Sequence, residues 1–296
     1  MSDNQLVVVR DQAILDCVTS VCTVRDLAIW ELAAREIPKH ISARRYRVIV
    51  PDDQVDVFKA RSPKQFEVHA ESGYATGLMD IIRSKMPENN KHRAGWYLQQ
   101  FIKIASLINN PPGECHLIWD SDTIPLKPLN FFTDEGKLVF YKSHERNPDY
   151  LPPIERLLGS TNRLQFSFIA QCLPYKSDWA QEFAERLEQL SSKSWEEAII
   201  DAIDFSKISG FSEYETLGAY ALEKHANEFE VINRPWFRYG GTLLGNIGNM
   251  ERSPYRWLLK RYDFISIESW DEDSKLPRII NFLNALRKEL LTKGSL

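Results

Sequence analysis

Short apolar segments alternate with longer amphipathic ones over about the first 130 residues, and this alternation limits the fold more narrowly than any other feature of the sequence. The short segments are rich in β-branched residues, and apolar residues recur at helical spacing in the longer ones. The predicted strands are 15–21, 46–50, 66–69 and 116–119, and the predicted helices are 25–37 and 95–109. This order predicts an α/β fold, a Rossmann-type and mostly parallel sheet flanked by helices.

The same patterns continue through the second half of the chain. They predict strands at 138–141 and 165–172, and helices at 179–190, at 195–205, after Ser212 and at 278–293. We find no internal repeat and no low-complexity linker. The sequence therefore predicts a single domain over residues 1–296, with 241–296 as a C-terminal helical extension.

Composition and charge exclude several classes of protein. A net charge of -4 and a pI near 5.9 argue against a nucleic-acid-binding protein, which normally has a basic excess. Charged residues within the first 16 positions argue against a signal peptide, and no apolar run reaches the ~18 residues of a membrane-spanning helix. The four cysteines form no Cys-x-x-Cys pair, which predicts reduced thiols in a cytoplasmic protein. The apolar face of the predicted helix 278–293 is more typical of core packing, and peripheral contact with a membrane stays open as the alternative.

An acidic motif follows directly after the predicted strand 116–119. Asp120 and Asp122 are two residues apart, so in an extended chain their side chains point the same way. Ligands of parallel sheets bind beyond the carboxyl ends of the strands. Two carboxylates there form a site of hard oxygen ligands, which predicts Mn²⁺ or Mg²⁺ together with a diphosphate. A plain acidic turn is the alternative, and the apolar residues on both sides of the motif disfavour it.

The helix at 95–109 has a polar face that is a candidate for donor binding. Gln99 and Lys103 lie four residues apart on one face. The candidates for contact with a nucleotide or its phosphates are Thr19, Arg93, Trp96, Gln99, Gln100, Lys103, Asp120, Ser121 and Asp122. An amphipathic helix with a solvated polar face is the alternative, and Trp96 alone is more typical of a core residue.

The segment at 210–215 predicts a capped helix with two acidic residues in its first turn. Ser212 and Glu215 fit a capping box, in which the Glu215 side chain bonds back to the Ser212 amide. Glu213 then has no structural task, and the helix start favours its ionised form. We predict Glu213 as a general base for a sugar hydroxyl, with Glu215 as the second catalytic candidate, and an exchange of the two roles stays open.

The acceptor site is less sharply marked. The candidates are His144, Gln171 and Tyr214. The aromatic and basic segment 234–241 is either a flap over a sugar or an ordinary turn packed by its own rings.

Four segments together resemble a known family. They are Val18-Thr19-Ser20-Val21-Cys22, Arg93-Ala94-Gly95-Trp96-Tyr97-Leu98-Gln99-Gln100, Trp119-Asp120-Ser121-Asp122-Thr123 and Phe211-Ser212-Glu213-Tyr214-Glu215-Thr216. Their order and spacing resemble an uncharacterised bacterial family of GT-A-like glycosyltransferases with an Asp-x-Asp motif, over about residues 15 to 240. The resemblance implies a GT-A fold, a nucleotide-sugar donor and a divalent metal at Asp120 and Asp122. Many GT-A enzymes add a late histidine ligand, but no histidine follows His225 here.

The sequence therefore predicts a cytoplasmic, metal-dependent glycosyltransferase with a nucleotide-sugar donor and a glycan or glycolipid acceptor, such as a bacterial polysaccharide precursor. Hexosyl transfer with inversion is preferred, because an acidic base candidate is present. One alternative is a nucleotidyltransferase on a related fold, which the lack of glycine in 22–26 disfavours. The other is an inactive nucleotide-sugar-binding module, which the intact Asp120 and Asp122 disfavour.

Overall fold

The computed structural model describes residues 13–159, 166–244 and 260–268, and its centre is a five-stranded sheet in the order β3-β2-β1-β4-β7. The strands are β1 (Leu15–Val21), β2 (Ala43–Val50), β3 (Phe66–Ala70), β4 (Cys115–Trp119) and β7 (Cys172–Lys176). The first four of these strands pair in parallel, and β7 runs antiparallel to β4. The predicted mostly parallel α/β sheet is confirmed.

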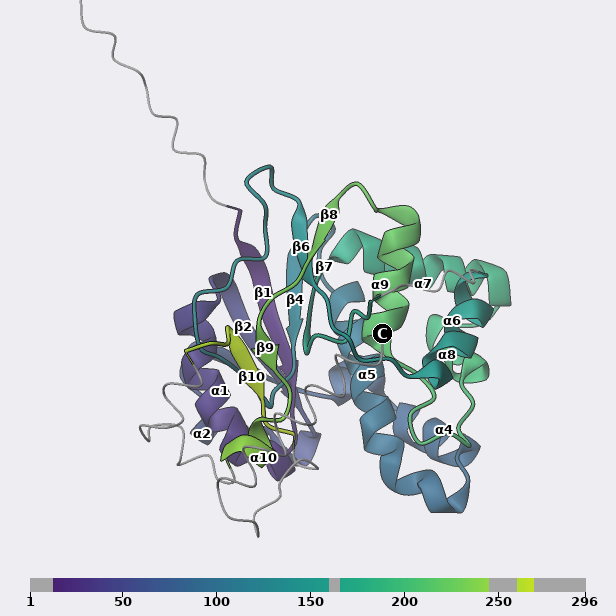
Figure 1. Cartoon of the computed structure of the whole chain (residues 1–296). Helices are drawn as coiled ribbons and strands as arrows, with labels where there is room; N and C mark the ends of the chain where they lie inside the picture. Colours follow the sequence, from purple (N-terminus) through teal and green to yellow (C-terminus); the bar gives the residue numbers. More distant parts are fainter. Residues whose placement is uncertain (1–12, 160–165, 245–259, 269–296) are drawn as a thin grey trace, which may run out of the picture.

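Helices cover both sides of this sheet. Figure 1 shows α1 and α2 on one side, with α5 and the green helices α7 and α9 on the other. The helices are α1 (Leu27–His40), α2 (Val55–Arg61), α3 (Ser72–Ala75), α4 (Leu78–Lys85), α5 (Ala94–Ile108), α6 (Leu151–Leu158), α7 (Ser177–Ser191), α8 (Trp195–Ala202), α9 (Glu213–Lys224) and α10 (Gly240–Leu244). Short 3₁₀ turns lie at Val24–Asp26, Asp52–Gln54, Glu88–Arg93 and Pro148–Tyr150.

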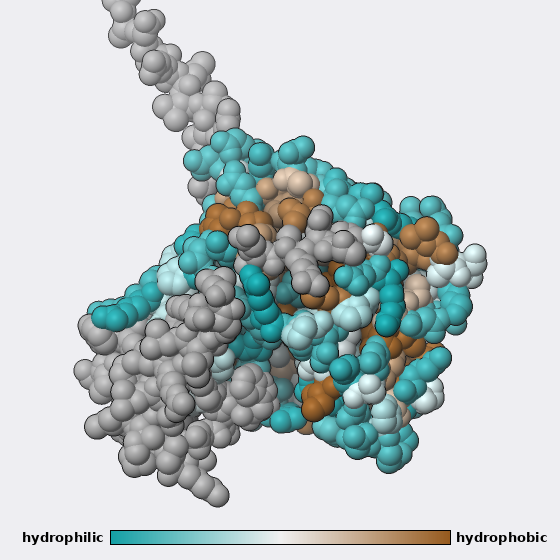
Figure 2. Space-filling model, turned by 45° about the vertical axis from the view of Figure 1, so that its right-hand side comes forward, coloured by the Kyte–Doolittle hydropathy of each residue, from teal (hydrophilic) through white to brown (hydrophobic). Residues whose placement is uncertain are grey.

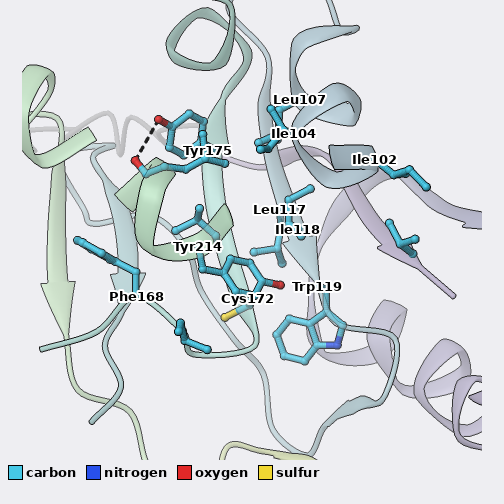
Figure 3. Close-up of a cluster of buried hydrophobic side chains, with 14 of the residues drawn as sticks. Ile102, Ile104, Leu107, Leu117, Ile118, Trp119, Phe168, Cys172, Tyr175 and Tyr214 are labelled. Carbon is cyan, nitrogen blue, oxygen red and sulfur yellow. Dashed lines mark hydrogen bonds between the residues drawn. The ribbon is translucent and has the colours of Figure 1, made fainter. Parts of the chain in front are cut away.

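The core is continuous across the sheet, because β1 and β4 are buried on both faces. Leu117 and Ile118 of β4 are at most 1% exposed, as expected for a central parallel strand. Figure 3 shows Leu117 and Ile118 in one cluster of buried side chains with Ile104 and Leu107 of α5 and Tyr214 of α9. The hydroxyl of Tyr175 on β7 donates to the Leu217 carbonyl oxygen at 3.2 Å, which fixes α9 against the edge of the sheet.

Two smaller sheets complete the fold. One has the order β5 (Thr123–Pro125), β10 (Phe264–Ser266) and β9 (Trp236–Phe237), and the other pairs β6 (Leu138–Tyr141) with β8 (Phe229–Ile232) in parallel. Of the predicted helical extension 241–296, the structure describes 241–244 and 260–268. The latter segment contains the buried strand β10 beside β5, so this part belongs to the core and is not helical. The predicted helix at 278–293 lies outside the described residues.

The prediction of a strand at 165–172 was wrong in its position. Residues 166–171 are irregular, and β7 begins only at Cys172. Pro174 lies inside β7, although a proline normally argues against a strand because it cannot donate a ladder hydrogen bond. It is tolerated here because β7 is the last strand of the five-stranded sheet.

The cysteines, the helices and the surface can be compared with what the composition predicted. All four cysteines are free, as predicted, and Cys115 is the least buried of them. Among the described residues, none of the helices combines the length and the apolarity that crossing a membrane requires. The face in Figure 2 is largely hydrophilic, with hydrophobic residues in separate areas.

Candidate active site

The site lies where the strand order of the central sheet reverses. β1 is flanked by β2 and β4. After β1 the sheet grows on one side through β2 and β3, and later in the chain it grows on the other side through β4 and β7. The carboxyl ends of such strands leave a crevice, the usual ligand site of α/β sheets. The Cys22 thiol after β1 interacts with Ser121 after β4, and burial raises the pKa of this thiol to about 12. The two loops therefore meet at the carboxyl ends of β1 and β4, where the sequence predicts a site at 120–122.

Asp120 occupies a fixed turn at the end of β4. Its amide donates to the Gln171 carbonyl oxygen at 3.0 Å, and its own carbonyl oxygen accepts from the Thr123 amide at 3.0 Å. Gln171 is buried and has a φ of 61°, a left-handed conformation that is uncommon for residues other than glycine. Such backbone strain gathers at functional sites. It turns the chain so that the Gln171 carbonyl faces Asp120.

A buried ammonium group joins Asp120 to α9. Lys103 Nζ donates to Asp120 Oδ1 at 2.6 Å and to Glu213 Oε1 at 2.7 Å. Tyr214 OH donates to the same Asp120 Oδ1 at 2.5 Å, and Lys103 Nζ lies 4.5 Å from the centre of the Tyr214 ring. Lys103 is 5% exposed, so this network lies below the surface and not on the solvated helix face considered above.

The charges in this network stabilise each other. Burial lowers the pKa of Lys103, but the carboxylates of Asp120 and Glu213 outweigh it and raise this pKa above its usual value. Burial raises the pKa of Glu213, while Lys103 acts against that shift. Lys103 therefore stays protonated and holds two carboxylates on elements far apart in the chain.

Asp122 lies in a concentration of negative charge. Its half-buried carboxylate Oδ1 is 3.5 Å from Ser266 Oγ, and its carbonyl oxygen accepts from the Ile267 amide at 2.9 Å. Burial raises the pKa of Asp122 well above its usual value, and the carboxylates of Glu268, Asp120 and Asp26 raise it further. A divalent cation would relieve this repulsion, so these residues fit a metal chemically. Among residues 13–159, 166–244 and 260–268, no group of three or more His, Cys, Asp or Glu side chains is arranged to hold a metal.

The predicted donor-binding face of α5 divides into buried and accessible residues. Gln100 is 1% exposed, its Oε1 accepts from the Glu213 amide at 3.0 Å, and its Nε2 donates to the Trp96 carbonyl oxygen. Both ends of this amide are therefore engaged within the protein, and we correct its assignment to donor contact. The Arg93 guanidinium lies 4.4 Å from the centre of the Trp96 ring, and thus covers one face of the ring. Gln99 is half-buried.

The predicted capping box at α9 forms only in part. Ser212 Oγ accepts from the Glu215 amide at 3.3 Å, but the Glu215 carboxylate turns away and accepts from the Phe168 amide at 3.5 Å. Burial raises the pKa of Glu215 to about 7, while Ser167 acts against this shift. The two glutamates thus have environments opposite to those predicted, because Glu213 carries the structural ion pair and Glu215 does not cap the helix.

The remaining candidates separate into buried and accessible positions. Thr19, in the middle of the central strand β1, is 1% exposed, and Tyr214 is 3% exposed with its hydroxyl bound to Asp120. Tyr214 therefore contacts the acidic motif and not an open acceptor surface, which corrects its assignment. The Gln171 side chain is also buried. His144 is half-buried and lines a cavity together with the segment 233–239.

Two acidic neighbours of Asp122 were absent from the sequence prediction. Asp26 follows β1 and Glu268 follows β10, so each comes from a segment distant from the motif. The residues directly around each of them do not distinguish either one from an ordinary surface carboxylate. For Asp26, its place just after β1 was a usable signal, because that loop borders the crevice. For Glu268 the sequence offers none.

A family model matches residues 14–271, which is most of the chain; its description is "Family of unknown function (DUF6492)". The chain belongs to the DUF6492 family. No curated protein sequence matches this DUF6492 member. This family description specifies no activity.

Three of the solved structures that resemble this DUF6492 chain are structures of glycosyltransferases. A crystal structure of an active-site mutant of LgtC aligns with a TM-score of 0.50 and 14% identity, over 94% of this chain and 99% of that one. The galactosyltransferase LgtC with donor and acceptor sugar analogues gives 0.47 and 12%, over 92% and 95%. Apo mouse xyloside xylosyltransferase 1 gives 0.49 and 10%, over 89% and 100%. At such identities the first of these likenesses establishes the fold, which is of the GT-A type.

Proposed function

We propose that this protein is a metal-dependent glycosyltransferase that transfers a hexose from a nucleotide-sugar donor to a glycan or glycolipid acceptor. The observation that supports it most is the position of Asp120 and Asp122 at the carboxyl end of β4, beside the reversal of strand order in a GT-A fold. We place the reaction in the cytoplasm, and a bacterial polysaccharide precursor is the acceptor class we favour.

Asp120 and Asp122 are the residues we assign to Mn²⁺ or Mg²⁺. Hard divalent cations prefer carboxylate oxygens, and phosphate oxygens and waters complete their coordination. When bound, the metal supplies charge neutralisation for a diphosphate leaving group. Burial and neighbouring carboxylates raise the pKa of Asp122, so a cation held there would offset an unfavourable negative charge, which supports the assignment.

We assign Lys103 a positioning role. Its ammonium group holds one oxygen of Asp120, and Tyr214 donates to the same oxygen, so the carboxylate has a fixed orientation. The second carboxylate oxygen of Asp120 then points in one direction, because the side chain is held in one rotamer. Preorganisation of this kind lowers the entropy cost of assembling a charged site.

We assign general-base catalysis to Glu215 rather than Glu213. A base acts best when its pKa lies near the working pH, and burial raises the pKa of Glu215 to about 7. The Glu213 carboxylate lies 2.7 Å from a protonated lysine, which weakens it as a proton acceptor. A carboxylate that takes the proton of the acceptor hydroxyl supports direct displacement, and therefore inversion at the transferred sugar.

The test is a thermal-shift and calorimetry panel of nucleoside diphosphates and nucleotide sugars, with and without Mn²⁺. We expect one nucleotide to raise the melting temperature only with metal, because a ligand at 100 times its Kd adds about 2.7 kcal/mol of stability. Donor hydrolysis in the same samples separates an enzyme from an inactive binding module. If no nucleotide stabilises the protein under either condition, the proposal is wrong.

A further inference from the structure

A cavity of about 220 Å³ lies between two segments that follow parallel strands. Residues 142–145 follow β6, and residues 233–239 follow β8 and include β9. Because β6 and β8 pair in parallel, both segments leave the same end of that small sheet. The volume is below the about 300–1,000 Å³ of sites for drug-sized ligands, so it suits a single sugar unit.

Backbone contacts connect this cavity to the acidic motif. Tyr239 in the cavity wall pairs with Ile267, whose amide donates to the Asp122 carbonyl oxygen at 2.9 Å. Arg238 Nε, in the same wall, donates to Glu268 Oε1 at 2.7 Å. Glu268 is also the carboxylate that raises the pKa of Asp122 most, after burial itself. The cavity is therefore beside the donor site that we propose.

Three cationic side chains line the cavity, those of Lys142, Arg234 and Arg238, and two of them are paired with carboxylates. Arg238 forms ion pairs with Glu145 and Glu268, and Arg234 NH1 lies 3.1 Å from Asp263 Oδ2. Lys142 is different, because it has no ion pair or side-chain hydrogen bond with any residue that the structure describes. Nearby, the buried Nδ1 of His144 also has no hydrogen-bond partner within the described parts of the chain. These groups can donate to an anion that enters the cavity.

An aromatic surface accompanies these polar groups. Trp236 stacks on Phe264 with ring centres 5.5 Å apart and an interplanar angle of 11°. Phe264 is fully buried in β10 and supports the indole from behind, whereas Trp236 itself is half-exposed. A ring held in this way offers flat apolar area, with polar groups around it to fix orientation.

We propose that this cavity holds the acceptor sugar, and that the acceptor bears a carboxylate or phosphate group bound by Lys142. The inference rests on the proposed glycosyltransferase function and adds the chemical class of the acceptor. Trp236 packs against the ring of the sugar, and His144 donates to the same anionic group. A neutral sugar would leave the charge of Lys142 without a partner.

The experiment compares three probes by ligand-observed NMR titration: methyl β-D-glucuronide, glucose 6-phosphate and methyl β-D-glucoside. We expect at least one of the two acids to bind about ten- to a hundred-fold tighter than the glucoside, as a hydrogen bond between charged groups allows. Whichever acid binds tighter identifies the carboxylate or the phosphate as the natural group. Equal affinity for all three probes overturns the inference.

A matched pair of variants assigns the effect to Lys142. Lys142→Gln should reduce the affinity for the favoured acid to that for the glucoside and leave the melting temperature unchanged. Lys64→Gln is the control, because Lys64 is exposed on the turn before β3, at the other edge of the sheet. Wild-type acid affinity in Lys142→Gln overturns the assignment.

Failure of this inference can be told apart from failure of the proposed function. Metal-dependent nucleotide binding, measured on the same preparations, reports the donor site alone and should be equal in wild type, Lys142→Gln and Lys64→Gln. If a nucleotide binds but no acid is preferred, only the acceptor inference falls. If an acid binds through Lys142 but no nucleotide binds, the transferase proposal falls and an anionic-sugar site remains.

Discussion

Lys103 on α5 and Glu213 on α9 lie 110 positions apart in the sequence, and their charged groups meet at 2.7 Å in the interior. Each residue is 5% exposed. Asp120 accepts from the same ammonium group, so one lysine joins two helices to the end of β4. The first turn of α9 is thus fixed by charge at the point where the site begins.

Removing that lysine should strongly destabilise the protein. Lys103→Met leaves the buried Glu213 carboxylate and the half-buried Asp120 carboxylate without their cation, and breaking a buried ion pair typically costs about 3–5 kcal/mol. We expect this loss in the free energy of unfolding, measured by urea titration at pH 7. Adding Glu213→Gln to the same chain should recover part of it, because one of the uncompensated charges is gone.

The control for this prediction is Lys64→Met. Lys64 is exposed and has no ion pair among the residues that the structure describes, so its change should stay within about 0.5 kcal/mol. Equal stability of Lys103→Met and Lys64→Met would show that the buried network contributes nothing.

Substitutions of Asp120 and Asp122 should have opposite effects on the stability of the protein, although both residues are assigned to the metal. Asp120→Ala removes the acceptor of Lys103 and Tyr214, and a hydrogen bond to a charged group contributes about 1.5–3 kcal/mol. Asp122→Asn should instead stabilise the metal-free protein at pH 7, because burial and like charges disfavour its carboxylate. Melting temperatures without metal test this, and a lower value for Asp122→Asn than for wild type contradicts it.

Nucleotide binding gives the second measurement on these variants. We expect both to lose the Mn²⁺-dependent affinity that calorimetry detects in wild type, because each removes a proposed metal ligand. Retained affinity in both would remove the metal from this motif.

Glu215 makes stability fall as the pH rises from about 4.5 to about 7. Its ordinary pKa is 4.5 and burial raises it to about 7 in the folded protein, so between these values the folded state binds more protons than the unfolded state. The stability that the protonated group contributes is complete below pH 4.5 and is lost as the pH rises to about 7. Glu215→Gln should therefore have a higher melting temperature than wild type at pH 8 and nearly the same one at pH 4.5.

Catalysis adds an independent readout for the same residue. If Glu215 is the base, Glu215→Gln should reduce turnover by about 10²–10⁴-fold with little change in donor affinity. Glu213→Gln should keep more activity, because its role is structural. A fully active Glu215→Gln would return the base to Glu213, or to a group outside this helix.

The sequence predicted the central architecture well because that information is local. Strand β1 and strand β6 were predicted with the bounds they have, and helix α5 within one residue at each end. Short apolar runs and helical periodicity encode such elements directly. The end of β4 could also be predicted as a candidate site, since strand ends and acidic pairs are both visible in the sequence.

The partners of the site residues could not be predicted in the same way. Lys103 meets Asp120 and Glu213 only because α5 and α9 pack on the same sheet, and a polar residue on a helix reads as solvated until that packing is known. The capping pattern at Ser212 likewise predicted a bond that the Glu215 carboxylate makes elsewhere, with Phe168. In both cases, contacts between segments distant in the sequence determined which of two interactions the side chain makes.

Gly218 lies where α9 packs against residues 166–168. A Cβ at this position would lie 2.2 Å from a ring carbon of Phe168, which is itself fully buried. Alanine favours a helix over glycine by about 1 kcal/mol, but overpacking a core typically costs about 1–3 kcal/mol or more, so the clash should win. Gly95→Ala on α5 is the matched control, because nothing lies within 4 Å of a Cβ there, and it should be neutral or stabilising. We expect Gly218→Ala to lose stability in urea titration, and Phe168→Leu in the same chain to restore part of it. Since the Phe168 amide also holds the Glu215 carboxylate, the clash should reduce turnover as well. A Gly218→Ala protein as stable and as active as Gly95→Ala would show that the 166–168 segment moves aside freely, and that it does not fix Glu215.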